Sequence, residues 1–141
     1  MKGGMILAAV VSAAAIPVLS STIRPVPGEH CAGDGVEVGK LLRIRIEAAD
    51  GKRWVFGSVR CAEDWLAHAH PGAVRVLVTG EVTGIETDAR NVTWAQSRVA
   101  TSRPTGERLH AFRRREDARA HAEAFGGTLI EDDARPFRGV P

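Results

Sequence analysis

Two cysteines carry the most distinctive chemistry in this sequence of 141 residues. Cys31 lies in a glycine-containing stretch, and Cys61 lies where a helix is expected to begin. The positive end of a helix dipole favours a thiolate over a thiol, and the thiolate is the form that binds metal. His30 and His68 could add imidazole nitrogens, since His68 falls seven residues after Cys61 on the same side of the expected helix. These four residues are the candidate metal ligands.

Two further interpretations of the same cysteines stay open. The compartment expected below for this chain is oxidising, so Cys31 and Cys61 could form a structural disulfide. Closing a loop of this length would stabilise the fold by roughly 3–4 kcal/mol in the chain-entropy model, provided that the two Cα atoms lie within about 7 Å. The third interpretation is a pair of unpaired, inert thiols. A reversible disulfide that is reduced when metal is loaded lies between the first two.

The remaining histidines are expected to have structural roles. His110 alternates onto one face of a strand, which indicates a hydrogen-bonded sheet histidine, and His121 lies on the apolar stripe of a helix, which indicates a core histidine. His70 precedes Pro71 and is expected at a helix end. The sequence has no Gly-x-Ser-x-Gly, His-Glu-x-x-His, phosphate-loop or dinucleotide motif, so we do not expect the protein to be an enzyme.

Two similar halves are expected to position these side chains. Alternation of Leu42, Ile44 and Ile46 with charged residues predicts a half-buried strand, and Asp50-Gly51 predicts a hairpin turn after it. A unit of about 40 residues cannot bury both faces of a small sheet, so the halves should pack together with a site at their junction. The predicted fold class is α+β, with two β-β-α-β units related by internal duplication at about 40–82 and 91–131. In the first half we expect strands at 41–49, 53–59 and 73–82, with a helix at 60–69 before the third strand. In the second half we expect strands at 91–101, 108–112 and 128–130, with a helix at 116–125 before the third strand.

The N-terminus has the character of an export or anchoring segment. Residues 3–23 carry no charge and follow Lys2, so residues 1–23 are predicted to be a hydrophobic helix that serves as a signal peptide or as an uncleaved membrane anchor. Residues 24–29 form a predicted linker, residues 30–135 the folded domain and residues 136–141 a tail. Either form of the N-terminus puts the domain outside the cytoplasm, in the periplasm or at the cell surface.

The composition narrows the range of partners. Nineteen basic and 17 acidic residues give a net charge of +2, which is too small to indicate a nucleic-acid partner. Two cysteines are too few for a disulfide-rich scaffold or a four-cysteine zinc ribbon. A hydrophobic share of 44% with three tryptophans is enough for a packed core, in which we expect Trp54, Trp65 and Trp94.

The order of several short motifs resembles the NosL family of exported proteins that handle copper for nitrous oxide reductase. The motifs are Cys31 before the first strand, Phe56-Gly57-Ser58-Val59-Arg60-Cys61 at the first helix, Pro104-Thr105-Gly106, Ala111-Phe112 and Phe125-Gly126-Gly127. The resemblance covers roughly residues 31–133 and implies a fold of two β-β-α-β units.

This resemblance implies copper(I) binding at Cys31 and Cys61, since thiolates are soft ligands that select copper(I). Two thiolates can hold copper(I) linearly, whereas Asp34 is a harder ligand that suits it poorly. Family members usually carry a methionine shortly after the first cysteine and another in a Thr-Pro-Met-Gly turn. Here the corresponding segments are Cys31-Ala32-Gly33-Asp34-Gly35 and Arg103-Pro104-Thr105-Gly106, so the sequence lacks both thioether ligands.

The leading hypothesis is therefore an exported copper(I)-binding accessory protein that passes its ion to a copper enzyme. The alternative is a non-metal interaction module, or an accessory subunit of a membrane protein complex, in which the two cysteines form a structural disulfide. Residues 3–23 would hold either protein to the membrane if they are not cleaved.

Overall fold

The computed structural model describes residues 28–140. The predicted signal peptide or anchor, residues 1–23, lies outside this range, as does most of the predicted linker. Between residues 28 and 140, the structure has no helix that is both long and apolar enough to cross a membrane.

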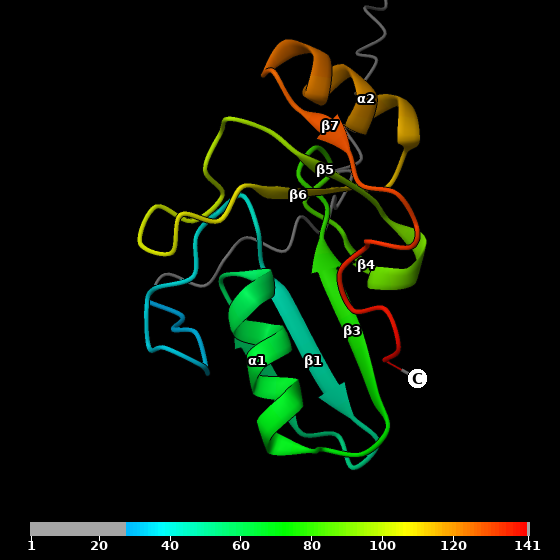
Figure 1. Ribbon diagram of the computed structural model, residues 1–141. Coiled ribbons are helices and arrows are strands. Elements are labelled where there is room, and N and C mark those ends of the chain that lie inside the picture. Colours follow the sequence, from blue (N-terminus) through cyan, green and yellow to red (C-terminus); the bar gives the residue numbers. More distant parts are fainter. Residues whose placement is uncertain (1–27, 141) are drawn as a thin grey trace, which may run out of the picture.

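The first sheet has four antiparallel strands in the order β2-β1-β3-β4, with α1 (Val59–Ala69) packed on one face (Figure 1). Its strands are β1 (Ile44–Ala48), β2 (Arg53–Phe56), β3 (Val74–Thr79) and β4 (Glu86–Asp88). The predicted period-two alternation is confirmed, because Ile44 and Ile46 are fully buried. On the opposite face, Arg43 and Arg45 both bind the Glu86 carboxylate, at 2.7 and 2.6 Å.

The second sheet has three antiparallel strands in the order β6-β5-β7 and is covered by α2 (Arg115–Ala124) (Figure 1). Its strands are β5 (Thr93–Gln96), β6 (Leu109–Phe112) and β7 (Thr128–Leu129). In both sheets the strand that comes first in its unit lies between the second and the last strand of that unit. The predicted α+β class is confirmed, and the origin of the two units by internal duplication stays a prediction.

The segment between the units differs from the sequence expectation. The structure adds β4 and a short 3-10 helix, η1 (Ala89–Asn91), neither of which was predicted. The strand β4 has only three residues, Glu86-Thr87-Asp88, and none is apolar. Its pairing with β3 therefore comes from backbone hydrogen bonds and from the ion pairs of Glu86, which hydrophobic periodicity does not reveal.

One hydrophobic core joins the two units. Trp94 of β5 is 1% exposed and belongs to the same cluster as Ile44 and Ile46 of the first sheet. The ring of Phe137 lies 6.2 Å from that of Trp94 and is also buried, with 6% exposed. The predicted boundary at residue 135 left Phe137 in a tail, whereas the structure places it in the core. A lone aromatic residue between Pro136 and Arg138 gives no periodic signal.

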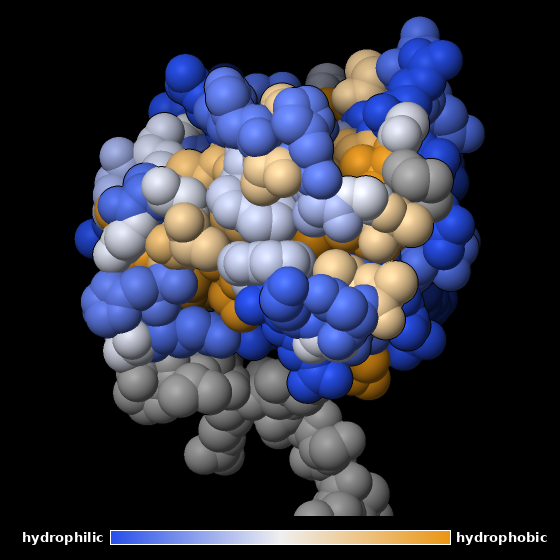
Figure 2. Space-filling model, turned by 90° about the horizontal axis from the view of Figure 1, so that it is seen from below, coloured by the Kyte–Doolittle hydropathy of each residue, from blue (hydrophilic) through white to orange (hydrophobic). Residues whose placement is uncertain are grey.

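The other two tryptophans pack at the edge of the core, beside the β1–β2 hairpin. Trp54 and Trp65 are half-buried, and their ring centroids lie 4.6 Å apart. With Ala69 and Pro71 they line a surface hollow beside the β1–β2 hairpin. Seen from below, the molecule mixes apolar and hydrophilic side chains, without one continuous apolar surface (Figure 2).

We expect Gly127→Ala to destabilise the fold by about 3 kcal/mol or more. A Cβ at residue 127 would lie 2.0 Å from the Gln96 carbonyl oxygen, so β7 could not approach β5. Urea unfolding followed by tryptophan fluorescence measures the change. Gly57→Ala is the matched control, because its Cβ would make only ordinary contacts, the nearest at 3.5 Å from Val38. Equal stability of the two variants would contradict the close approach of β7.

Candidate metal site

A tight loop places the first cysteine against the edge of the first sheet. The loop closes through hydrogen bonds from the Cys31 N–H to the Val36 carbonyl, at 2.8 Å, and from the Gly35 N–H to the Cys31 carbonyl, at 2.9 Å. Gly35 has a φ of 73°, in the left-handed region that favours glycine. The Ala32 N–H donates to the Val55 carbonyl at 2.7 Å and ties the loop to β2. Cys31 is consequently buried, with 4% exposed.

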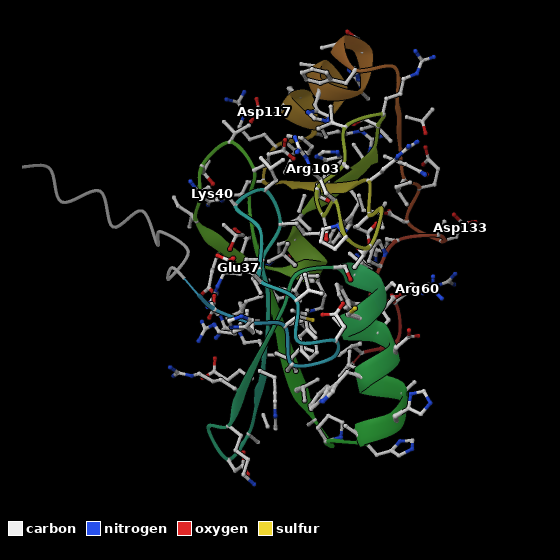
Figure 3. All side chains as sticks on the ribbon, turned by 90° about the vertical axis from the view of Figure 1, so that its left-hand side faces the viewer. Glu37, Lys40, Arg60, Arg103, Asp117 and Asp133 are labelled. Carbon is white, nitrogen blue, oxygen red and sulfur yellow. The ribbon has the colours of Figure 1, made fainter. Side chains whose placement is uncertain are left out.

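The second cysteine occupies the first turn of α1. The Cys61 N–H donates to the hydroxyl of Ser58 at 3.2 Å, and Ser58 is the N-cap of the helix. The Cys31 loop crosses this turn closely, because a Cβ at Gly33 would lie 3.4 Å from the Cβ of Cys61 and 3.7 Å from the Sγ of Cys31. Both sulfur atoms therefore lie where the loop meets the first turn of α1. Figure 3 shows the loop, in blue, beside the end of α1 that carries Arg60.

Cys31, Cys61 and Asp34 form a group with metal-ligand geometry. One sulfur from each cysteine and one carboxylate oxygen all lie within 4.8 Å of one another. The thiol of Cys61 donates to Oδ2 of Asp34 at 3.0 Å, and Oδ1 of Asp34 accepts from the Val36 N–H at 3.0 Å. Both cysteines are free thiols, so the structure contains no disulfide between them. The sequence analysis considered Asp34 only as a poor ligand for copper(I) and missed its hydrogen bond to Cys61, although its spacing of three residues from Cys31 in a glycine-rich loop is a usable signal.

The Cys61 thiol is not activated as a helix N-terminus alone would predict. Burial, followed by the hydrogen bond to Asp34, raises the pKa of Cys61 to about 11, although Ser58 acts in the opposite direction. The same contact, together with the Val36 N–H, lowers the pKa of Asp34 below its usual value. The expectation that the helix dipole would favour a thiolate is therefore wrong for the metal-free protein. The short-range effects of burial and a neighbouring carboxylate outweigh the partial charge of the helix end.

The two histidines predicted as weaker ligands lie elsewhere. His30 is exposed and forms an isolated β-bridge with Glu37. His68 is exposed as well, and its Nδ1 lies 2.6 Å from the Asp64 carbonyl oxygen one turn earlier in the same helix. Neither belongs to the group of Cys31, Asp34 and Cys61.

The turn in which the family carries its second methionine lies beside the start of α1. Thr105 and Gly106 line a surface hollow together with Val59, Arg60 and Glu63 of the helix. The first turn of α1 therefore faces both the Cys31 loop and this turn of the second unit. The placement of a site at the junction of the units stays a prediction.

The other histidines occupy the positions expected of them. His110 is fully buried in β6, where its Nε2 donates to the Val99 carbonyl at 3.0 Å. His121 is largely buried on α2, and its Nε2 lies 3.0 Å from the Ser97 hydroxyl. His70 is the C-cap of α1, in a left-handed conformation with a φ of 43°.

These features define a NosL-like fold, as a comparison with solved structures shows. The chain is similar to the crystal structure of the copper chaperone NosL from Shewanella denitrificans, with a TM-score of 0.60 and 19% identity over 80% of this chain and 93% of that one. No family model and no curated protein matches the chain. The resemblance recognised from the sequence motifs is confirmed, and the low identity agrees with the departures noted at the two methionine positions.

At pH 7 we expect iodoacetamide to alkylate Cys61 roughly a hundredfold more slowly than a thiol with the ordinary pKa of 9.0, because the pKa of about 11 leaves little thiolate. Asp34→Asn should raise the Cys61 rate severalfold, since it removes the neighbouring negative charge while burial persists. Mass spectrometry of the Cys61 peptide measures both rates. Asp64→Asn, an exposed carboxylate on the same helix, is the control and should leave the rate unchanged. A rate that does not respond to Asp34→Asn would contradict the assigned hydrogen bond.

Proposed function

We propose that this chain is a NosL-like accessory protein that binds copper(I) through the thiolates of Cys31 and Cys61. The observation that carries the proposal is the meeting of two sulfurs from separate elements, within 4.8 Å of each other and of Asp34. The fold supports it, because the similar solved structure is that of a copper chaperone. The role is one of binding and transfer, with no catalytic step.

The chemistry of the donor set favours copper(I) over harder ions. Two thiolates are soft ligands, and copper(I) accepts two-coordinate thiolate binding. The carboxylate of Asp34 is a poor third ligand for copper(I), so we assign it a different role. In the metal-free protein this carboxylate accepts a hydrogen bond from the Cys61 thiol, at 3.0 Å, and together with burial it keeps the thiol protonated.

Copper binding then displaces a proton from Cys61. Metal ions bind the deprotonated form of cysteine, so loading releases this proton and the affinity rises with pH below the pKa of about 11. A protonated, partly buried thiol also reacts slowly with oxidants. The metal-free protein is thereby protected from premature disulfide formation while the two sulfurs stay close enough to receive an ion.

We propose that the protein works outside the cytoplasm. Residues 1–23 would serve as a signal peptide or membrane anchor, and the folded domain would work in the periplasm or at the cell surface. The partner would be a copper enzyme that receives the ion from the protein.

A second candidate function is a non-metal interaction module, in which Cys31 and Cys61 become a disulfide. The observation in its favour is the segment Cys31-Ala32-Gly33-Asp34-Gly35, which has no methionine although the family usually carries one shortly after the first cysteine. A Cβ at Gly33 would lie 3.7 Å from the Cys31 Sγ, so this segment lies directly at the site. Loss of a thioether at that point removes one soft ligand and weakens the case for copper.

Titration of the reduced full-length chain with copper(I) against a competing chelator tests the main proposal. We expect one bound ion, and an affinity at least about a hundredfold lower in Cys31→Ser and in Cys61→Ser. His30→Ala and His68→Ala are the controls, and they should keep the full affinity because neither side chain belongs to the group of Cys31, Asp34 and Cys61. Unchanged affinity in both serine variants would overturn the proposal.

Gly33→Met should raise the affinity for copper(I) about tenfold or more, because it adds a thioether beside the two thiolates. The backbone permits the change, since the new Cβ would make contacts no closer than 3.4 Å. Gly33→Leu is the matched control of similar size without sulfur. If Met and Leu at this position act alike, the gain comes from packing and the assignment of the site fails.

A further inference from the structure

A second group of ligand-type side chains lies away from the cysteines. It contains Glu81, from the turn after β3, together with His110 of β6 and His121 of α2. The group therefore joins the first unit to the second. It is well shielded, because the side chains are 15%, 0% and 9% exposed, respectively.

Both imidazoles turn the same ring atom toward one carboxylate. Nδ1 of His110 contacts Oε2 of Glu81, and Nδ1 of His121 lies 3.8 Å from Oε1 of the same residue. One nitrogen from each ring and one carboxylate oxygen all lie within 4.8 Å of one another. The two ring centroids are 4.2 Å apart.

The opposite ring atoms are already occupied. Nε2 of His110 donates to the Val99 carbonyl at 3.0 Å and lies 3.1 Å from the Ser97 hydroxyl. Nε2 of His121 lies 3.0 Å from the same hydroxyl, which also accepts from the Val99 N–H at 3.1 Å. Metal-binding histidines are held in this way, with the distal nitrogen fixed by a hydrogen bond so that the other can bind the ion.

Nδ1 of His121 distinguishes this group from a purely structural network. It has no hydrogen-bond partner in the part of the chain that the structure describes, although its ring is nine-tenths buried. Nδ1 of His110 is hydrogen-bonded to Oε2 of Glu81, so these two groups share a proton in the metal-free protein. A metal ion that replaces this proton would also bind the His121 nitrogen.

We propose that Glu81, His110 and His121 form a binding site for a divalent cation of zinc type. Two imidazole nitrogens and one carboxylate oxygen are a usual zinc donor set, which leaves a fourth position for water. Zinc–ligand distances near 2.0–2.1 Å put tetrahedral donors about 3.4 Å apart. Nδ1 of His121 and Oε1 of Glu81 lie 3.8 Å apart, close to this spacing, whereas Nδ1 of His110 and Oε2 of Glu81 are in hydrogen-bond contact and would have to separate to admit the ion. The set contains no thiolate or thioether, so it does not select copper(I).

Zinc binding at this site links the two units of the domain. Its ligands come from the β3–β4 turn, β6 and α2, so the ion stabilises the folded state and is lost on unfolding. The proposal is independent of copper(I) binding at the cysteines, and either can fail without the other.

The test is a zinc titration of the full-length chain in a Cys31→Ser/Cys61→Ser background, which removes thiolate binding. We expect one bound zinc ion and a midpoint of thermal unfolding that rises with zinc concentration. His121→Gln and Glu81→Gln should each lower the affinity at least tenfold and abolish the thermal shift. His68→Gln, an exposed histidine outside the group, should change neither.

A second measurement does not depend on the folding of any variant at the site. Nitrogen NMR of the histidine-labelled Cys31→Ser/Cys61→Ser protein, in which all three zinc ligands are intact, follows the rings as zinc is added. We expect the Nδ1 signals of His110 and His121 to move together with one equivalent of zinc. If zinc instead shifts His30 and His68 while His110 and His121 stay in place, or if one equivalent binds equally to His121→Gln, the proposal is overturned.

Discussion

The free edge of β2 is the constraint on which the candidate copper site depends. β2 is the outer strand of the first sheet, so one side of it lacks a neighbouring strand. The hydrogen bond from Ala32 to Val55 places the Cys31 loop along that side. Because β2 leads directly into α1, the same placement sets the loop against the first turn of the helix. The meeting of the two sulfurs is a consequence of covering this edge.

The second unit depends on the first for much of its burial. Its own cluster consists of Ala95, Phe112 and Ala118 with Leu129 packed against them, which is small for a three-stranded sheet. Trp94 points into the larger cluster of the first unit instead. Glu81 adds a polar link, since its backbone N–H donates to the Ala111 carbonyl at 3.0 Å. The turn of the first unit that presents Glu81 to the two histidines is therefore fixed to β6.

Much of the fold follows from local patterns in the sequence. The alternation around Ile44 and Ile46 predicts β1, and the apolar stripe of α1 predicts that helix to within one residue of its observed start. Strands were predicted too long, because isolated apolar residues stand beyond the last paired position, as Val82 does after Gly80 and Glu81 at the end of β3. The polar strand β4 has no apolar pattern at all.

The candidate sites were predictable only in part, since they depend on tertiary contacts. The residue types singled out Cys31 and Cys61, but the dipole argument could not include the carboxylate that the loop brings to Cys61. Glu81 is separated from His110 by 29 residues in the chain, and no motif connects them. Each histidine alone fits a structural role, which is what the sequence predicted. Their common orientation toward one carboxylate becomes visible only when the two units are packed together.

The burial of Phe137 has a consequence for the order of events during biosynthesis. Its ring packs on Trp94, and its N–H donates to the Glu63 carboxylate of α1 at 2.9 Å. The shared core is thus incomplete until residue 137 has left the ribosome, long after both cysteines have been translated. Domains fold as units once their whole core is available. The nascent chain therefore exposes its two thiols before the surroundings that protect them have formed.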